Sequence, residues 1–131
     1  FDEKTDPELK AFEPEINPKL RIYYKKKISN DTGAIPLYTD SVNVFYRGSF
    51  IFGETFDQNF TGADPGPFDS PTKFTVGGVS GWAEILQRMR VGERWLVYIP
   101  WELAYGASGT DDIPGYSTLI FDMQLEEILD E

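Results

Sequence analysis

One stretch of the chain, residues 80–92 (SGWAEILQRMRVG), has the spacing of a helix, and it is the only convincing helix in 131 residues. Its apolar residues recur at intervals of three and four and so share one face: Trp82, Ile85, Leu86 and Met89. Gly92 can end the helix in a left-handed turn. With so little helix available, the rest of the core has to come from a β-sheet.

Five other stretches have the composition and alternation of β-strands: LRIYYKKKI, VNVFYRGSFI, TKFTV, ERWLVYI and TLIFDMQLEEI, beginning at residues 20, 42, 72, 93 and 118. The two-residue period places Val42, Val44 and Tyr46 on one face. It does the same for four residues of the last stretch: Leu119, Phe121, Met123 and Leu125. The pattern predicts an α+β domain, an antiparallel sheet of about five strands with one short α-helix packed across it.

The first 19 residues differ in composition from the rest. They contain three prolines and many acidic residues, without a clear apolar period. We therefore interpret residues 1–19 as an acidic, Pro-containing arm or linker, and residues 20–131 as the folded domain.

The composition excludes several classes of function. The chain has no cysteine and no histidine, which removes thiol chemistry, the usual general base and the commonest transition-metal ligand. Twelve basic against 22 acidic residues give a formal net charge of −10, which argues against a nucleic-acid partner. No apolar run approaches the ~18 residues of a membrane span. An enzyme built from this chain must use carboxylates, hydroxyls, backbone groups and shape.

A helix lying on a sheet leaves a hollow at one end, and such hollows are common ligand sites. The long segment IPWELAYGASGTDDIPGYSTLIF, residues 99–121, borders it and carries Tyr105 between glycine-rich turns. From the residues alone, these side chains could line a ligand site or could serve only the structure, and both interpretations stay open. Inward aromatics such as Trp82 and Phe121 are ordinarily core, and an aspartate after a strand, such as Asp57, is ordinarily a turn former.

Three segments, in order and at compatible spacing, resemble the FKBP-type peptidyl-prolyl cis–trans isomerases: VNVFYRGSFIFGETFD, GGVSGWAEILQRMRVGER and IPWELAYGASGTDDIPGYSTLIFDMQL. The resemblance runs from about Leu20 to the C-terminus. It implies a twisted antiparallel sheet wrapped around one short helix (FKBP-like). It also implies an isomerase, or rotamase, that speeds rotation of X–Pro bonds and assists protein folding as a chaperone. The expected partners are proline-containing polypeptide segments and macrolide inhibitors, with no cofactor, no metal and a monomeric state.

The resemblance also implies roles for individual residues. Tyr105 is expected to donate its hydroxyl to a substrate carbonyl, and Asp57 corresponds to the carboxylate of the family's pocket; these two are the catalytic candidates. The expected substrate-binding residues are Trp82 as the floor of the pocket, its sides Tyr46, Phe56 and Phe121, the backbone N–H of Val79, and Ile113 over the rim.

The chain departs from the family's pattern after Asp57. The family often has an arginine there, whereas this chain has no cation until Lys73. The segment between them is also longer than in the smallest members, and Thr72 stands where an aromatic is usual. We expect Phe68 or Phe60 to supply that missing pocket wall. The missing arginine keeps an alternative function open: a catalytically weak binding module for Pro-containing segments.

The expected location is the bacterial cell envelope or periplasm. The chain begins at Phe1 rather than Met, as a protein would after removal of a signal segment, although a cloning boundary gives the same start. Bacterial members of the family with a short acidic arm before a single domain are often exported. The cytoplasm is the alternative.

Overall fold

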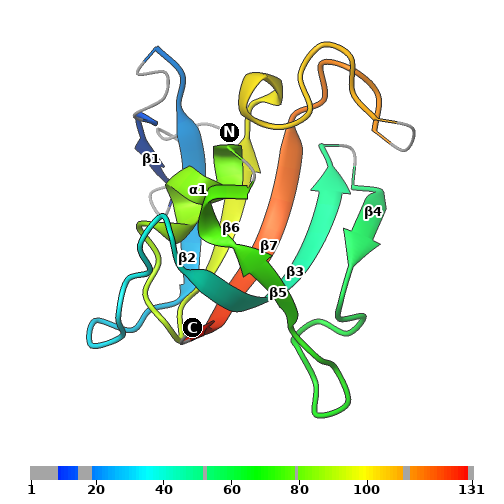
Figure 1. Cartoon of the computed structure of the whole chain (residues 1–131). Helices are drawn as coiled ribbons and strands as arrows, with labels where there is room; N and C mark the ends of the chain where they lie inside the picture. Colours follow the sequence, from blue (N-terminus) through cyan, green and yellow to red (C-terminus); the bar gives the residue numbers. More distant parts are fainter. Residues whose placement is uncertain (1–8, 15–18, 52, 79, 111–112, 130–131) are drawn as a thin grey trace.

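A computed structural model describes residues 9–14, 19–51, 53–78, 80–110 and 113–129 (Figure 1). Over these residues the strands are β1 Lys10–Phe12, β2 Ile22–Ile28, β3 Ser41–Phe50, β4 Thr55–Gln58, β5 Thr72–Thr75, β6 Arg94–Ile99 and β7 Leu119–Leu129. The α-helix is α1 Ser80–Leu86, and two short 3-10 turns are η1 Val76–Gly78 and η2 Trp101–Leu103. No helix in these ranges is long and apolar enough to cross a membrane.

The described strands form one antiparallel sheet in the order β1-β2-β6-β7-β3-β4, and β5 pairs with β3 beside β4. Helix α1 lies across one face of this sheet (Figure 1). The predicted fold class is confirmed. The sheet has seven described strands instead of about five, because β1 and β4 are only three and four residues long and carry too short a pattern to identify.

The core lies between α1 and the sheet. The predicted stripe of the helix is buried there, with Trp82 6% exposed and Ile85, Leu86 and Met89 fully covered. The predicted inward face of β7 is buried as well, with at most 5% exposure at Leu119, Phe121, Met123 and Leu125. Both periodicities therefore predicted the correct faces.

The helix ends earlier than its pattern predicts. Its regular part stops at Leu86, and the chain then turns, with the backbone N–H of Met89 still donating to the carbonyl of Ile85 at 3.1 Å. Gly92 does adopt a left-handed backbone, φ 92°, but its N–H donates to the carbonyl of Leu125 in β7 at 2.8 Å. Gly92 therefore shapes the turn into β6 rather than the end of α1.

The described part of the N-terminal arm packs on the domain. Leu9 is 6% exposed, and β1 pairs with the start of β2. The ring of Phe12 lies 5.8 Å from that of Tyr24 and 4.0 Å below the guanidinium of Arg88. This strand lies within residues 1–19, so these apolar residues tie at least part of the arm to the sheet. The division of the chain at residue 19 stays a prediction.

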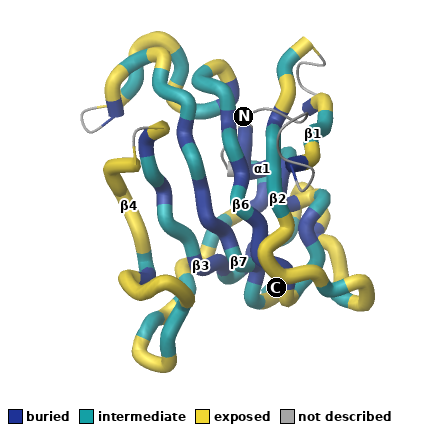
Figure 2. The backbone as a smooth tube through the Cα atoms, turned by 180° about the vertical axis from the view of Figure 1, so that it is seen from behind, coloured by how far each residue is buried: buried dark blue, intermediate teal, exposed yellow. Residues whose placement is uncertain are grey.

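Figure 2 shows the sheet from behind, with α1 on its far side. This face of the sheet carries a buried ionic group. Arg94, 2% exposed, donates to both carboxylate oxygens of Asp122, at 2.8 and 2.7 Å, and also pairs with Asp64. Lys27 approaches Asp122 at 3.1 Å. Burial alone would raise the pKa of Asp122, but the hydrogen bonds from Arg94 and Lys27 outweigh it and hold that pKa below its usual value.

Candidate active site

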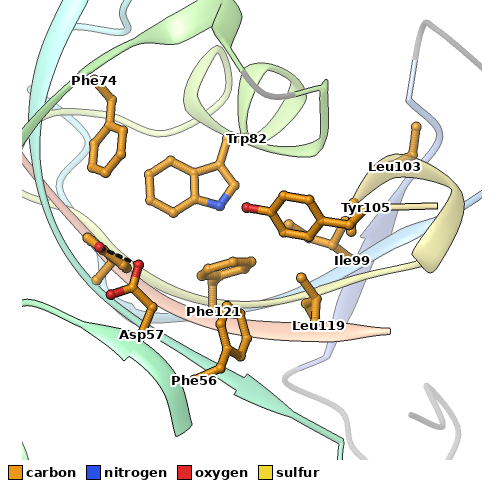
Figure 3. Close-up of a pocket in the computed structure, with 11 residues that line it drawn as sticks. Phe56, Asp57, Phe74, Trp82, Ile99, Leu103, Tyr105, Leu119 and Phe121 are labelled. Atoms are coloured by element: carbon orange, nitrogen blue, oxygen red, sulfur yellow. Dashed lines mark hydrogen bonds between the residues drawn. The ribbon is translucent and has the colours of Figure 1, made fainter. Parts of the chain in front are cut away.

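A cavity of about 80 Å³ opens between α1, the sheet and the segment that follows β6 (Figure 3). Its lining comes from separate parts of the chain: Tyr46, Phe56, Asp57, Phe74, Trp82, Ile99, Leu103, Ala104, Tyr105, Leu119 and Phe121. Eight of these eleven residues are apolar or aromatic without a charge or hydroxyl. The cavity therefore suits a small apolar ring better than a charged group.

The indole of Trp82 is the centre of the aromatic lining. Phe121 meets it edge-on, with ring centroids 5.3 Å apart and planes at 90°, and Tyr46 does so at 5.5 Å and 75°. Phe74 lies 4.7 Å away, tilted by 60°. Edge-to-face contacts of this kind hold each ring in one orientation. The lining is thus preorganised, with little freedom to collapse into the cavity.

Gly48 makes room for two of the rings. A Cβ atom at this position would lie 2.6 Å from Cζ of Phe56 and 2.8 Å from Cε1 of Phe121. Both distances are below ordinary contact, so any side chain would push these rings out of place. Phe56 and Phe121 meet edge-on over Gly48, 5.7 Å apart at 83°.

Two polar groups meet at one edge of the cavity. The hydroxyl of Tyr46 donates to Oδ2 of Asp57 at 2.7 Å (Figure 3). Burial, followed by the hydrogen bond and the charge of Asp57, raises the pKa of Tyr46 to about 12. The phenol therefore stays protonated, and remains a donor to Asp57, across the physiological range.

The amide of Asn59 fixes the backbone of Tyr46. Strand β4 pairs with β3 at Arg47 and beyond, whereas β5 pairs with β3 only up to Val44. Asn59 occupies the edge between them. Its Oδ1 accepts from the N–H of Tyr46 at 2.8 Å, its own N–H donates to the carbonyl of Tyr46 at 3.0 Å, and its Nδ2 donates to the carbonyl of Val44 at 2.9 Å. With two side-chain bonds and one backbone bond, Asn59 thus replaces a missing piece of strand.

Tyr105 lies at the mouth of the cavity, 41% exposed, and its hydroxyl points across toward Trp82 (Figure 3). The turn η2 and the glycines after it hold this position. The N–H of Gly106 donates to the carbonyl of Trp101 at 2.9 Å, and the N–H of Gly109 donates to that of Tyr105 at 3.1 Å. Both glycines have positive φ, 68° and 67°, which ordinary residues adopt only with strain. Tyr105 is therefore held in position by a hydrogen-bonded turn.

The structure brings six of the predicted site residues together at this cavity: Tyr46, Phe56, Asp57, Trp82, Tyr105 and Phe121. Val79 lies outside the described residues. Ile113 is 5% exposed and packs in the core, and it is not among the residues that line the cavity.

Phe60 and Phe68 do not supply a cavity wall, and that prediction is wrong. Phe68 is 99% exposed. Phe60 is buried on the other face of the sheet, with its ring 4.4 Å from the guanidinium of Arg47 and 5.5 Å from that of Arg94. The long segment after β4 is anchored over the ionic group, so its rings face away from the cavity.

Five lining residues were not predicted: Phe74, Ile99, Leu103, Ala104 and Leu119. All five lie in or next to segments singled out from the sequence. Phe74 is the aromatic of the β5 pattern, and Leu119 is on the inward face of β7. The period predicted the inward direction of Leu119, but a residue that lines a cavity and one that fills the core share the same period.

The arrangement offers noncovalent chemistry. No group of three or more Asp or Glu residues that could hold a metal ion occurs in the described part of the chain. What lines the cavity is a set of rings, one exposed phenol and one carboxylate held by a second phenol. Such a site can bind an apolar ring and direct a hydroxyl at a polar atom beside it.

Comparison with known proteins identifies what this architecture is similar to. A family model described as FKBP-type peptidyl-prolyl cis-trans isomerase matches residues 33–126. The FKBP-type 22 kDa peptidyl-prolyl cis-trans isomerase of Escherichia coli is 44% identical over 104 residues, which cover 78% of this chain and 48% of that protein.

Solved structures agree. A peptidyl-prolyl cis-trans isomerase from Pseudomonas syringae superposes with a TM-score of 0.76 at 31% identity, over 98% of this chain and 86% of that one. FkpA from Escherichia coli gives a TM-score of 0.77 at 31% identity, over 94% and 52% of the two chains. The chain spans about half or less of the length of the first curated relatives it matches, 48% and 34%.

Proposed function

This chain belongs to the FKBP-type peptidyl-prolyl cis–trans isomerase family, and on that basis we propose that it accelerates the rotation of X–Pro bonds in polypeptides. The observation that carries the proposal is the aromatic cavity floored by Trp82, with the hydroxyl of Tyr105 at its mouth. The cavity has room for one small apolar ring, and the pyrrolidine ring of proline is such a ring.

The reaction needs none of the groups that the composition lacks. Rotation of an X–Pro bond removes amide resonance, against a barrier of ~18–20 kcal/mol, and the uncatalysed exchange takes tens to hundreds of seconds. A turnover of roughly 10–1,000 per second requires the barrier to fall by about 4–8 kcal/mol. Because no covalent bond breaks, neither a nucleophile nor a proton acceptor is required.

An apolar cavity can lower this barrier by selective binding. A planar amide is more polar than the twisted one, so its transfer from water into an apolar cavity disfavours the two planar ground states more than the transition state. Rigid aromatic rings around Trp82 supply that environment without reorganising. A donor beside the cavity then stabilises a carbonyl in its turned position.

Two residues are assigned to the polar stabilisation of the turned amide. Tyr105 donates its hydroxyl to a carbonyl of the substrate, since its phenol is at the mouth of the cavity and 41% exposed. Asp57, held by Tyr46, supplies a fixed negative charge beside the rotating amide. The rings of Tyr46, Phe56, Trp82 and Phe121 hold the pyrrolidine, while Val79 and Ile113 keep the roles that the family resemblance implies.

A protease-free assay of peptide isomerisation tests the proposal, with Tyr105→Phe and Asp57→Ala as variants. We expect each to lower kcat/KM by tenfold or more while the melting temperature stays within a few degrees. Two exposed residues outside the cavity supply matched controls: Tyr38→Phe and Asp31→Ala should leave the rate unchanged. An unmodified protein that binds a proline peptide but does not accelerate its isomerisation would instead identify a binding module.

The proposal extends to partners and location. The substrates are flexible or unfolded segments that contain proline, and macrolides with a proline-like ring are expected to compete for the same cavity. The protein is expected to act as a monomer, which light scattering can measure. Export to the cell envelope stays a prediction, and fractionation of cells that make the protein tests it.

A further inference from the structure

A second hollow, of about 270 Å³, lies beside the proposed proline cavity. It is lined by Phe50, Ile51, Tyr116, Ser117 and Thr118. These residues come from two places, which meet at one end of the sheet (Figure 1). One is the last residue of β3 with the turn that follows it, and the other is the segment that leads into β7. We call this hollow the β3–β7 hollow.

The β3–β7 hollow displays apolar surface to solvent. Ile51 is 61% exposed and Tyr116 is 66% exposed, whereas Phe50 forms its buried base at 8% exposure. Ser117 and Thr118 add hydroxyl-bearing side chains to the lining. An apolar base with exposed apolar sides and polar groups near it is typical of a site that takes one apolar side chain from a partner.

Tyr116 is held in an unfavourable backbone conformation at this hollow. Its φ of 60° makes it the only non-glycine residue with positive φ among the described residues. Three contacts keep it there: its N–H donates to the carbonyl of Gly106 at 3.0 Å, Ser117 Oγ donates to the carbonyl of Pro114 at 2.7 Å, and the ring of Trp101 lies 4.8 Å away at 71°. Strain that is maintained by surrounding contacts is a feature of ligand-binding positions.

The lining of the β3–β7 hollow contacts the lining of the proline cavity. Phe50 pairs directly with Leu119 across β3 and β7, and its ring lies 5.1 Å from that of Phe56. Leu119 and Phe56 line the proline cavity, whereas Phe50 and Thr118 line the hollow. The two sites are therefore separated by about one layer of side chains. An extended polypeptide therefore needs only a few residues to span from the cavity to the hollow.

We propose that the β3–β7 hollow is a second substrate subsite, which binds an apolar or aromatic side chain of the same polypeptide whose proline occupies the cavity. This inference rests on the proposed function. One layer of side chains corresponds to a separation on the order of 10 Å, and an extended chain advances about 3.3 Å per residue. The subsite thus selects substrates with an apolar residue about two to four positions from the proline.

A peptide series tests the subsite. Each peptide carries one proline in a Ser/Gly-rich sequence, with a single Phe placed two, three or four residues before or after it, and a matched peptide carries Ser instead. For the unmodified protein we expect one placement to raise kcat/KM by roughly three- to tenfold over its Ser partner, as partial burial of a side chain provides. A blocked peptide with only one residue on each side of the proline measures basal activity.

Two variants test whether the gain in kcat/KM comes from the β3–β7 hollow. Tyr116→Asn removes the ring and keeps a residue that tolerates the left-handed backbone, and Ile51→Ser removes the other exposed apolar side chain. Each should reduce the gain to less than twofold and leave the basal peptide unchanged. Leu37→Ser, 68% exposed and away from the hollow, is the matched control and should keep the full gain.

The outcomes separate this inference from the proposed function. If the basal peptide is isomerised but no Phe placement gives a gain, or the gain survives in both variants, the subsite is refuted. If the basal peptide is not isomerised, the proposed function fails, and fluorescence anisotropy of the same labelled peptides decides the subsite. Tighter binding of a Phe peptide that both variants abolish supports it, and equal binding of the Phe and Ser peptides overturns it.

Discussion

Substitution of Asn59 by alanine is expected to destabilise the domain and to disturb the candidate site, although this residue does not line the cavity. Its side chain satisfies the N–H of Tyr46 and the carbonyl of Val44 on the edge of β3 that neither β4 nor β5 covers. It also donates to Thr72 Oγ1 at 3.0 Å. Alanine removes all of these bonds at once.

The magnitude follows from the two backbone groups. A typical hydrogen bond contributes about 1 kcal/mol to stability, and a buried group left without a partner costs about 1–3 kcal/mol. Val44 is fully buried and Tyr46 half-buried, so water replaces only part of what is lost. We expect the free energy of unfolding to fall by about 2–4 kcal/mol. For a domain of this size that is a drop of roughly 6–15 °C in melting temperature.

Chemical denaturation with a fluorescence readout measures this change. Asn59→Asp keeps the acceptor for Tyr46 but places a carboxylate oxygen against the carbonyl of Val44, so it should destabilise the domain at least as much as alanine. Asn43→Ala is the matched control on the same strand. Its side chain donates to the exposed carboxylate of Glu127, at 2.6 Å, and the loss of this bond should cost less than about 0.5 kcal/mol.

A second measurement separates the loss of the fixed position of Tyr46 from a general loss of stability. Spectrophotometric titration of the tyrosines reports the pKa of Tyr46, which should fall from about 12 toward its ordinary value when the phenol loses its fixed contact with Asp57. An Asn59→Ala protein with unchanged stability, or a destabilised one in which this titration and kcat/KM are unaltered, would refute the reasoning.

Three further predictions concern other parts of the fold. Gly48→Ala should push Phe56 and Phe121 into the cavity and lower kcat/KM by at least tenfold; an active, undisturbed protein would contradict the stated clash. Burial alone would raise the pKa of Glu93, but the backbone N–H groups of Arg90 and Asn30 outweigh it and lower that pKa below 4.5. The stability that Glu93 contributes is therefore present above pH 4.5 and is lost as the pH falls through the lowered pKa. In Glu93→Gln the free energy of unfolding should depend less steeply on pH in that acid range, and an unchanged slope would count against the prediction. Phe68→Ser should leave melting temperature and activity unaltered, because the ring touches almost nothing, and any loss above about 0.5 kcal/mol would show an unrecognised contact.

The sequence predicted those features that depend on one local period. The stripe of α1 and the inward face of β7 follow from spacings of three to four and of two residues, and these faces are buried as expected. The six site residues at the cavity were predicted through family resemblance. Their inward orientation alone could not separate a cavity lining from core.

What the sequence missed depends on long-range contacts. Nothing local to Phe60 indicates that it will lie between Arg47 and Arg94, residues 13 and 34 positions away. Likewise, Asn59 is an ordinary polar residue in a loop-like segment until β4 and β5 both reach β3 and leave an edge between them. Both features appear only once the sheet has formed.

The same contacts bear on the absence of a cation between Asp57 and Lys73. An arginine near a carboxylate would hold it by charge and by a forked hydrogen bond. Here a neutral phenol holds Asp57, and Asn59 in turn holds the backbone of that phenol. The position of the carboxylate is thus set by the sheet through two hydrogen bonds rather than by a long flexible side chain. The cation missing from the sequence therefore does not leave Asp57 unpositioned, and the favoured activity stays an isomerase rather than a module that only binds.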